Sequence, residues 1–429
     1  MTRITDPITL PCGIELPNRL AKAAMTEGLA DPQNRATDRH LNLYNYWAAS
    51  HVGLSLSGNI HVDRRYLERV GNVAVDGNGG LDELKAMAAA GSQNGTQFWA
   101  QISHAGRQSP ADICAEPLAP SASAVHMPGA EFNTPRAATE DDIADVIERF
   151  VHAAETARAC GFGGIQVHAA HGYLLSEFLS PLTNQRNDRW GGSLENRARL
   201  LTEIVTRVRK AVGPAFPIAV KLNSADFQKG GFSPEDSREV LRMLDDLGVD
   251  LVELSGGNYE DPVLLFGDND ANGRPVREST RQREAYFLDF AREAREVWQK
   301  PLMVTGGFRT AKAMNVALAA GELDMIGIGR PLVGDPACTA RLLDGSADSL
   351  PRFEDRLQPV GPDALPELDE ATRLTANTFG HLGWFYMNIF RIGDGESPAI
   401  DATMLDSIQQ FPPLEQAVVE RWESPWQSA

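Results

Sequence analysis

Short apolar runs alternate with longer amphipathic segments over the first 330 residues of the chain. The runs have the length and composition of buried strands, and most are followed by apolar positions at helical spacing. The predicted strands are 19–25, 52–59, 96–102, 163–167, 217–222, 250–254, 301–305 and 324–328. Strands that alternate with helices favour parallel βαβ units. Eight such strands predict an α/β fold, a closed (β/α)₈ TIM barrel.

The helices between these strands have recognisable ends. The segment from Thr139 opens with a Thr-x-x-Asp cap, and the segment from Ser233 has Ser as its N-cap and Pro234 at the first helical position. Gly91 is expected to stop an Ala-rich helix as its C′ residue. The predicted helices are 38–50, 81–91, 139–160, 194–210, 233–247, 284–298 and 311–320.

Three segments lie outside the alternation. Residues 4–16 turn at a Pro-Cys-Gly sequence and predict a β-hairpin before the barrel. Residues 108–137 form a long loop with little periodicity, a length that is usually functional or disordered. Beyond about residue 351, a Pro-rich acidic linker precedes an aromatic helix at 375–392. We therefore expect a barrel at 1–345 and a C-terminal extension at 346–429 that packs on the barrel or on a partner subunit.

Polar and glycine-rich groups follow the predicted strands at their carboxyl ends. In a TIM barrel these ends meet at the face that carries the active site. The groups are Thr26, Gly58, Asn59, Gln101, His104, His168, His171, Lys221, 255–257, Gly306, Gly307, Gly329 and Arg330. The agreement between pattern and chemistry predicts one site at this face.

The stretch 167–197, which opens VHAAHGY, carries the densest chemistry. His168 and His171 could bind a metal, but the carboxylates that would complete such a site are missing from the motif. Two N–H donors are better suited to an oxygen or oxyanion of a substrate. Tyr173 would be protonated at neutral pH and could supply a proton. The plain alternative is three polar side chains packed in a loop.

Lys221 lies inside an apolar strand, where an unpaired charge is costly. It could favour negative charge near the N1–O2 region of a flavin, and the Gln101 amide could bond the pyrimidine edge. The main alternative to this flavin-binding role is that Lys221 forms a Schiff base with a carbonyl substrate, as in barrel aldolases. Gly306 and Gly307, with Gly329 and Arg330, follow the last two strands, whose loops often bind phosphate. Alternatively, these glycines only make tight turns.

Composition narrows the choice of function. The net charge of −18 and the pI near 5.0 argue against nucleic-acid and anionic-membrane partners. The expected partner is a small-molecule substrate. The cysteines are widely spaced, so no CxxC metal motif exists, and a reducing cytoplasm is the expected location. No signal peptide and no long apolar run are evident, so no membrane span is expected. The aromatic extension would suit a homo-oligomer interface.

The segment HAAHGYLLSEFLSPLTNQRNDRWGGSLENRARLLTEI resembles the signature of the Old Yellow Enzyme family of FMN-dependent NAD(P)H:flavin oxidoreductases. PITLPCGIELPNRLAKAAMT, QISHAGRQ, VKLNSADFQKGGFS, MVTGGF and MIGIGRPLVGDP match in family order, so the resemblance covers about the first 340 residues. It implies a barrel with non-covalent FMN at its mouth. It also implies a ping-pong reaction, in which NAD(P)H reduces flavin N5 and the hydride then passes to the β-carbon of an activated alkene.

The resemblance also implies residue roles. His168 and His171 hold the substrate carbonyl or nitro oxygen, His168 also borders the cofactor, and Tyr173 protonates the α-carbon. Thr26 contacts the flavin C4–O4 edge and Gln101 binds the pyrimidine. The remaining implied cofactor contacts are Ala24, Met25 and Asn59 on the same face, Lys221 near the ring, and Gly306, Gly307, Gly329 and Arg330 at the phosphate.

The chain departs from the family pattern in three places. Lys221 stands where many members have arginine, which keeps the charge but loses the planar fork. Trp190 stands where tyrosine is common and is expected to pack. No cysteine follows Cys338, so the iron–sulfur cluster of some branches is not expected. Three alternatives stay open: a cluster-free NADH oxidase or amine demethylase, a Lys221 aldolase, and a flavin-binding scaffold without turnover.

Overall fold

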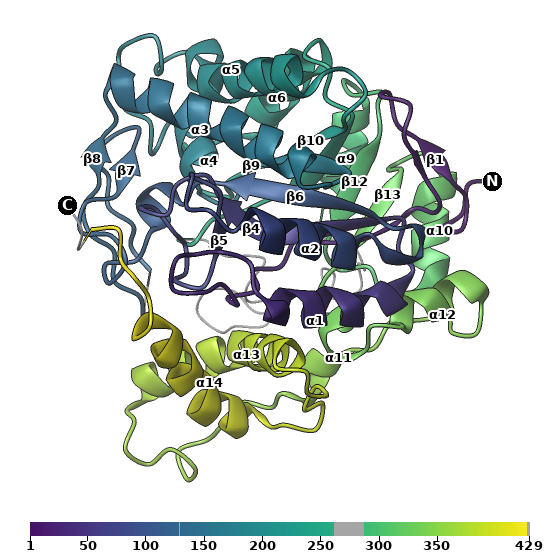
Figure 1. Ribbon diagram of the computed structural model, residues 1–429, viewed down its shortest axis with the longest axis vertical. Helices are drawn as coiled ribbons and strands as arrows, with labels where there is room; N and C mark the ends of the chain where they lie inside the picture. The colour runs from purple at the N-terminus through teal and green to yellow at the C-terminus, as the bar shows by residue number, and fades with distance from the viewer. Residues whose placement is uncertain (128, 261–286, 427–429) are drawn as a thin grey trace.

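The structure is a computed structural model that describes residues 1–127, 129–260 and 287–426. Its centre is a barrel of eight parallel strands surrounded by helices, as the sequence predicts (Figure 1). The order around the barrel is β3, β13, β12, β11, β10, β9, β6 and β4, and pairing of β4 with β3 closes it. These strands are β3 (Leu20–Lys22), β4 (Leu54–His61), β6 (Gln97–Ser103), β9 (Gly164–Ala169), β10 (Ile218–Asn223), β11 (Leu251–Ser255), β12 (Leu302–Thr305) and β13 (Met325–Ile328).

The outer layer consists of helices that each bury one apolar stripe against the strands. The helices of this layer are α1 (Asp38–Trp47), α2 (Leu81–Gly91), α3 (Glu140–Ala159), α5 (Leu194–Val212), α6 (Pro234–Asp245), α9 (Leu288–Arg295) and α10 (Ala311–Ala319). Thr139 and Ser233 are the N-caps of α3 and α6, and each side chain accepts a backbone N–H, as predicted. Part of the predicted helix 284–298 lies outside the described residues.

Shorter strands and helices lie between the barrel strands and the outer helices along the chain. The strands are β1 (Ile8–Thr9), β2 (Glu15–Leu16), β5 (Val73–Ala74), β7 (Leu118–Ala119) and β8 (Arg136–Ala137). The α-helices are α4 (Leu174–Leu179), α11 (Pro331–Gly334) and α12 (Cys338–Asp344). Single 3₁₀ turns occupy Ala48–Ser50, Gln93–Gly95, Gly106–Gln108 and Phe353–Arg356. The predicted N-terminal hairpin is the antiparallel pair β1–β2.

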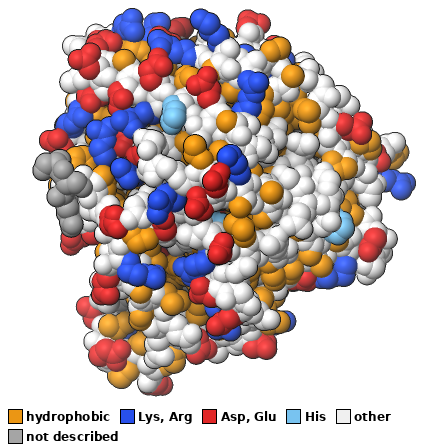
Figure 2. All heavy atoms as spheres, in the orientation of Figure 1, with side chains coloured by type: hydrophobic (Ala, Val, Ile, Leu, Met, Phe, Trp, Pro, Cys, Tyr) orange, Lys and Arg blue, Asp and Glu red, His pale blue; other side chains and the backbone are white. Residues whose placement is uncertain are grey.

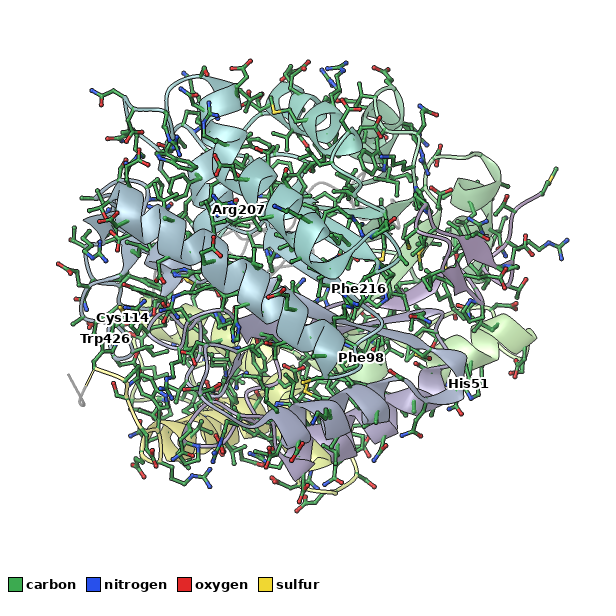
Figure 3. All side chains as sticks on the ribbon, turned by 45° about the horizontal axis from the view of Figure 1, so that its top comes forward. His51, Phe98, Cys114, Arg207, Phe216 and Trp426 are labelled. Carbon is green, nitrogen blue, oxygen red and sulfur yellow. The ribbon has the colours of Figure 1, made fainter. Side chains whose placement is uncertain are left out.

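Two local predictions need correction. Gly91 is the last residue of α2 rather than its C′ residue, and a Cβ on it would lie 2.3 Å from the Phe98 ring, which packs between strands and helices (Figure 3). Glycine is needed there for packing and not for a turn. No helix was predicted between residues 167 and 194, but the helix α4 begins there, directly after Tyr173. That helix holds the Tyr173 backbone in place.

The apolar core is divided by the strands into two parts. The larger part fills the space between strands and helices. The smaller part fills the barrel interior, where Trp99, Leu251 and Met303 meet Leu10 and Leu16 of the N-terminal hairpin segment. The hairpin therefore closes the N-terminal end of the barrel, and a cavity opens at the opposite end. Acidic and basic side chains are interspersed on the surface shown in Figure 2.

The C-terminal segment forms two helices, α13 (Glu370–Gly393) and α14 (Met404–Val419), that pack together beside α1 (Figure 1). Arg69, in the loop after β4, donates to Glu415 at 2.8 Å, and its guanidinium lies 3.9 Å from the Tyr386 ring centroid. Trp426 donates to the Arg65 carbonyl at 3.2 Å (Figure 3). Helix α14 was not predicted. Among the described residues, no helix combines the length and apolar character that a bilayer crossing requires.

We expect Gly58→Ala to destabilise the barrel by about 1–3 kcal/mol, because the new methyl group has no room. It would lie 2.1 Å from Glu27 Oε2 and 2.6 Å from the Met25 carbonyl oxygen. Glu27 cannot move easily, since it accepts the Gly58 N–H at 2.8 Å and the Tyr44 hydroxyl. Thermal unfolding measures the change. Gly361→Ala, where a Cβ meets nothing within 4 Å, is the control, and an equal loss there would contradict the argument.

Candidate functional site

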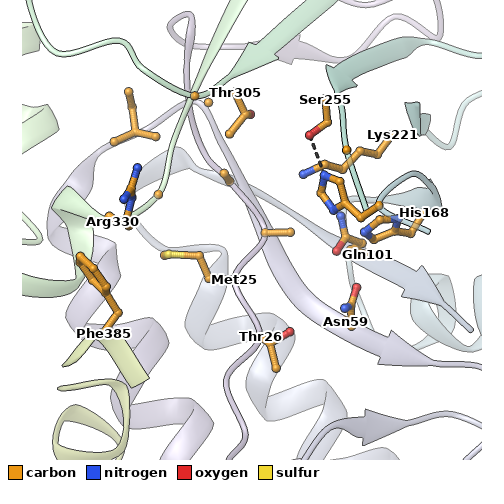
Figure 4. A pocket seen from close by; sticks show the side chains of 18 of the residues that line it. Met25, Thr26, Asn59, Gln101, His168, Lys221, Ser255, Thr305, Arg330 and Phe385 are labelled. Atoms are coloured by element: carbon orange, nitrogen blue, oxygen red, sulfur yellow. Dashed lines mark hydrogen bonds between the residues drawn. The ribbon is translucent and has the colours of Figure 1, made fainter. Parts of the chain in front are cut away.

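A cavity of about 320 Å³ opens at the carboxyl ends of the barrel strands (Figure 4). Every residue to which the family resemblance assigns a role lines it: Ala24, Met25, Thr26, Asn59, Gln101, His168, His171, Tyr173, Lys221, Gly306, Gly307, Gly329 and Arg330. Gly58, another of the predicted strand-end groups, does not line it. Ser255–Gly257 belong to the same wall. His104, another strand-end group, is buried elsewhere and stacks on Tyr66 at 4.8 Å. Parallel strands bring these distant residues to one end of the barrel.

His168 is a hydrogen-bond donor to the cavity. Burial, with the nearby cationic groups, lowers the pKa of its ring well below the usual value, so the ring is neutral at pH 7. Its Nδ1 accepts the Ala170 backbone N–H at 3.3 Å. A neutral imidazole has one N–H, so the proton must be on Nε2. Strand β9 thus presents a single N–H donor that does not depend on pH near neutrality.

His171 is placed by a tight turn after β9. Its φ of 62° is left-handed, a conformation that histidine tolerates better than most residues. Its backbone N–H donates to Asn223 Oδ1 at 3.1 Å, and its Nε2 lies 2.6 Å from Ser255 Oγ. Burial and Lys221 lower its pKa well below the usual value. The two imidazole rings lie 5.1 Å apart, so both can contact one small group.

Tyr173 is the N-cap residue of α4, and its hydroxyl points into a polar cluster. The hydroxyl donates to the Glu68 carboxylate and lies 3.0 Å from the Tyr259 hydroxyl. Burial and the adjacent Glu68 raise the pKa of Tyr173 well above its usual value. The phenol therefore carries its proton throughout the neutral range. Its ring lies 4.8 Å from the His168 ring.

The groups around the cavity fit a long, flat, phosphate-bearing cofactor. Gln101, Lys221 and His168 lie on one side, and Arg330 and Phe385 lie on the other, with Met25 between them (Figure 4). Gly306 and Gly307, which have positive φ values of 119° and 84°, add backbone without side chains to the cavity lining. Buried Asn59 Oδ1 and Thr305 Oγ1, at the same cavity, have no hydrogen-bond partner among the described residues. Such atoms need a ligand or water.

A model of the NADH:flavin oxidoreductase / NADH oxidase family matches residues 3–349. The chain belongs to this family. The NADH-dependent flavin oxidoreductase iliE of Hypocrea jecorina is 37% identical over 352 residues, covering 77% of this chain and 86% of that protein. The protein of the same name in Neonectria sp. is 37% identical over 351 residues, 77% of this chain, and this chain spans 45% of its length.

Solved structures agree with the family match. An Old Yellow Enzyme homologue from Zymomonas mobilis superposes with a TM-score of 0.68 at 26% identity, covering 82% of this chain and 95% of the other. A 2-naphthoyl-CoA reductase superposes with a TM-score of 0.73 at 27% identity, covering 80% of this chain and 52% of the other. The resemblance seen in the sequence is therefore confirmed. This member of the NADH:flavin oxidoreductase family is an FMN-dependent oxidoreductase that uses a nicotinamide cofactor.

Three contributions to the cavity of this flavin oxidoreductase were not predicted from the sequence. Glu68 accepts from Asn59 Nδ2 at 2.7 Å, and from the Thr26 and Tyr173 hydroxyls. Tyr259 contacts Tyr173. Helix α13 adds Leu382, Phe385, Tyr386 and Ile389. Glu68 and Tyr259 lie in loops without periodicity, and the pattern of α13 shows a helix but not the surface that it covers.

Proposed function

We propose that the protein is an ene-reductase that reduces activated alkenes such as enones, enals and nitroalkenes. The observation that carries this proposal is the pairing of two donors at one cavity. The neutral His168 ring presents an N–H, and Tyr173 presents a protonated hydroxyl, with the two rings 4.8 Å apart. A hydrogen-bond donor polarises the substrate oxygen, and a proton donor completes the reduction.

The residues suited to hold FMN are those that line the cavity. Gln101 and Lys221 would meet the pyrimidine ring, with Thr26, Asn59, Ala24 and Met25 beside it. Gly306, Gly307, Gly329 and Arg330 would meet the phosphate. Bound FMN would supply the hydride chemistry, the exchange of a hydride between NADH or NADPH and the β-carbon of the alkene. Thr26 has a second role here, since its hydroxyl donates to Glu68.

The chain's own residues complete that reaction. His168 and His171 hold the carbonyl or nitro oxygen and draw electron density away from the β-carbon. Tyr173 gives its hydroxyl proton to the α-carbon, so that one hydride and one proton saturate the double bond. Burial of Tyr173 and His168 excludes bulk water from this exchange. The Tyr259 hydroxyl, at 3.0 Å, can stabilise the phenolate that Tyr173 becomes.

The Schiff-base alternative loses support from the surroundings of Lys221. Its Nζ lies 3.0 Å from Glu253 Oε1, and both side chains are buried. This ion pair holds the Lys221 side chain, whereas a Schiff-base lysine needs a free amine that can reach the substrate carbonyl. We also propose that the chain divides near residue 345 into the cofactor-binding barrel and an extension that completes the cavity. The protein would work without an iron–sulfur cluster.

Anaerobic stopped-flow absorbance tests the proposed function. We expect yellow protein, from which heat releases FMN, and loss of the flavin absorbance when NADH or NADPH is added. Enones or nitroalkenes should restore the absorbance under anaerobic conditions. If only O₂ restores it, the protein is an NADH oxidase, and if a tertiary amine reduces the flavin, it is a demethylase. A colourless protein that borohydride traps on a carbonyl substrate would support the aldolase alternative.

A further inference from the structure

Lys221 and Gln101, which line the cavity, are both connected to Glu253, which does not line it. Glu253, on β11, is completely buried inside the barrel. Its Oε2 accepts a hydrogen bond from Gln166 Nε2 at 2.8 Å, and its Oε1 lies 3.0 Å from Lys221 Nζ. Gln166, also completely buried, accepts from Gln101 Nε2 at 2.6 Å. The chain of contacts runs from Glu253 to both Lys221 and Gln101.

Strand register brings these side chains together. Lys221 is paired with Glu253 in the β10–β11 ladder, and Gln101 is paired with Gln166 in the β6–β9 ladder. The Gln166 side chain reaches across the barrel interior to Glu253 and joins the two pairs. Four polar side chains from four strands therefore form one buried network below the cavity, and Gln101 and Lys221 are its cavity-facing members.

The Glu253 carboxylate determines which group donates and which accepts in each hydrogen bond of this network. An ionised carboxylate only accepts hydrogen bonds, so Gln166 must turn its NH₂ group toward Glu253. The Gln166 carbonyl oxygen then faces Gln101, which must donate through its own NH₂ group. This leaves the Gln101 carbonyl oxygen and one remaining hydrogen for the cavity. With an amide in place of Glu253, both glutamines could turn over, because each amide end donates or accepts.

The same carboxylate also balances charge. Lys221 borders the cavity, and its Nζ lies 3.0 Å from Glu253 Oε1, so the carboxylate offsets the lysine charge. Without this carboxylate, the positive charge of Lys221 would be unbalanced below the bound flavin. Positive charge at that position stabilises the reduced, anionic form of the cofactor. Glu253 therefore limits how strongly Lys221 favours reduction.

We propose that Glu253 is a positioning residue of the FMN site, which orients the Gln101 amide toward the flavin pyrimidine and lowers the reduction potential by offsetting Lys221. The inference rests on the FMN site of the proposed function and not on the alkene. Glu253 would act through residues of the cavity lining, because it does not line the cavity itself. Its effect on FMN affinity would act through Gln101 and its effect on the reduction potential through Lys221, so the two effects can be measured separately.

The test uses the full-length holoenzyme and the apo-protein prepared from it. We expect Glu253→Gln to weaken FMN binding about tenfold in fluorescence titrations, because the Gln101 hydrogen bond is no longer oriented. The midpoint potential should rise by about 30 mV, which is a tenfold change for a two-electron couple. In a Gln101→Leu background Glu253→Gln should add little further loss of affinity, and in a Lys221→Met background it should shift the potential little.

Glu177→Gln is the matched control. Glu177 is a buried carboxyl group outside the cavity, and burial raises its pKa to about 8, so the amide resembles the protonated form present at pH 7. Neither FMN affinity nor potential should change in this variant. Additive effects of Glu253→Gln and Gln101→Leu, or an unchanged or lower potential, would overturn the proposal. Wild-type protein that binds FMN but reduces no alkene would refute only the ene-reductase function, because neither measurement involves an alkene.

Discussion

Replacing Tyr173 by phenylalanine is expected to slow flavin reoxidation by an enone about 100- to 10,000-fold, the usual contribution of a general acid. The substitution removes the only proton that Tyr173 can give and keeps the ring that packs against His168. Reduction of the flavin by NADH should proceed at the wild-type rate, because that step needs no proton from Tyr173. Stopped-flow absorbance at the flavin band measures the two half-reactions separately.

Two other tyrosines serve as controls for this prediction. Tyr66→Phe, in a buried ring that does not line the cavity, should change neither half-reaction. Tyr259→Phe removes the hydroxyl 3.0 Å from Tyr173 and should slow reoxidation less than Tyr173→Phe. If Tyr259→Phe has the larger effect, the proton donor is Tyr259. If Tyr173→Phe slows both half-reactions equally, the proton-donor role is wrong.

His168→Ala is expected to lower kcat/KM for the alkene about 100- to 1,000-fold, the typical loss for one donor to a developing oxyanion. The structure shows which ring nitrogen donates. Because Nδ1 accepts the Ala170 backbone N–H, the proton of the neutral ring is on Nε2. Since the pKa of His168 lies well below its usual value, the ring stays neutral as pH rises through 6.5. The alkene reaction should therefore show no titration near pH 6.5.

The comparison variant for His168 is His104→Ala, which removes another buried imidazole outside the cavity. It should affect stability, through lost stacking on Tyr66, and leave alkene reoxidation unchanged. His168→Gln, which retains an N–H donor, should recover part of the lost rate. A bell-shaped or rising profile through pH 6.5 in the wild-type protein would show that the ring titrates there and that the neutral-donor role is wrong.

The barrel and the strand-end residues were predictable because both depend on local signals. Each apolar run is a strand that is buried on both sides, and the residue after each run must lie at the same end of a parallel barrel. Gln101, His168 and Lys221 each lie at the carboxyl end of such a run, so their shared cavity is predictable from the sequence. Capping chemistry likewise located the starts of α3 and α6 to within a residue. The order of strand and polar group along the chain is sufficient for these conclusions.

Partnerships between distant residues could not be predicted in this way. Nothing in the sequence around Glu68 shows that its carboxylate accepts from Tyr173, 105 residues away. The sequence around Glu253 likewise gives no sign of its partner, because only the register of β10 and β11 pairs it with Lys221. Helix α13 was expected, but its contribution of Tyr386 to the cavity depends on packing against α1 and Arg69.

The sequence by itself determined the barrel, its family and the identity of the side chains at its mouth, because strand periodicity and strand-end position are properties of neighbouring residues. The tertiary structure decided the protonation and direction of those side chains. His168 became a neutral Nε2–H donor through its burial and the Ala170 N–H, and Tyr173 became a firmly protonated phenol through its burial and Glu68. Burial and hydrogen-bond partners arise only after the chain has folded, so no local pattern encodes them.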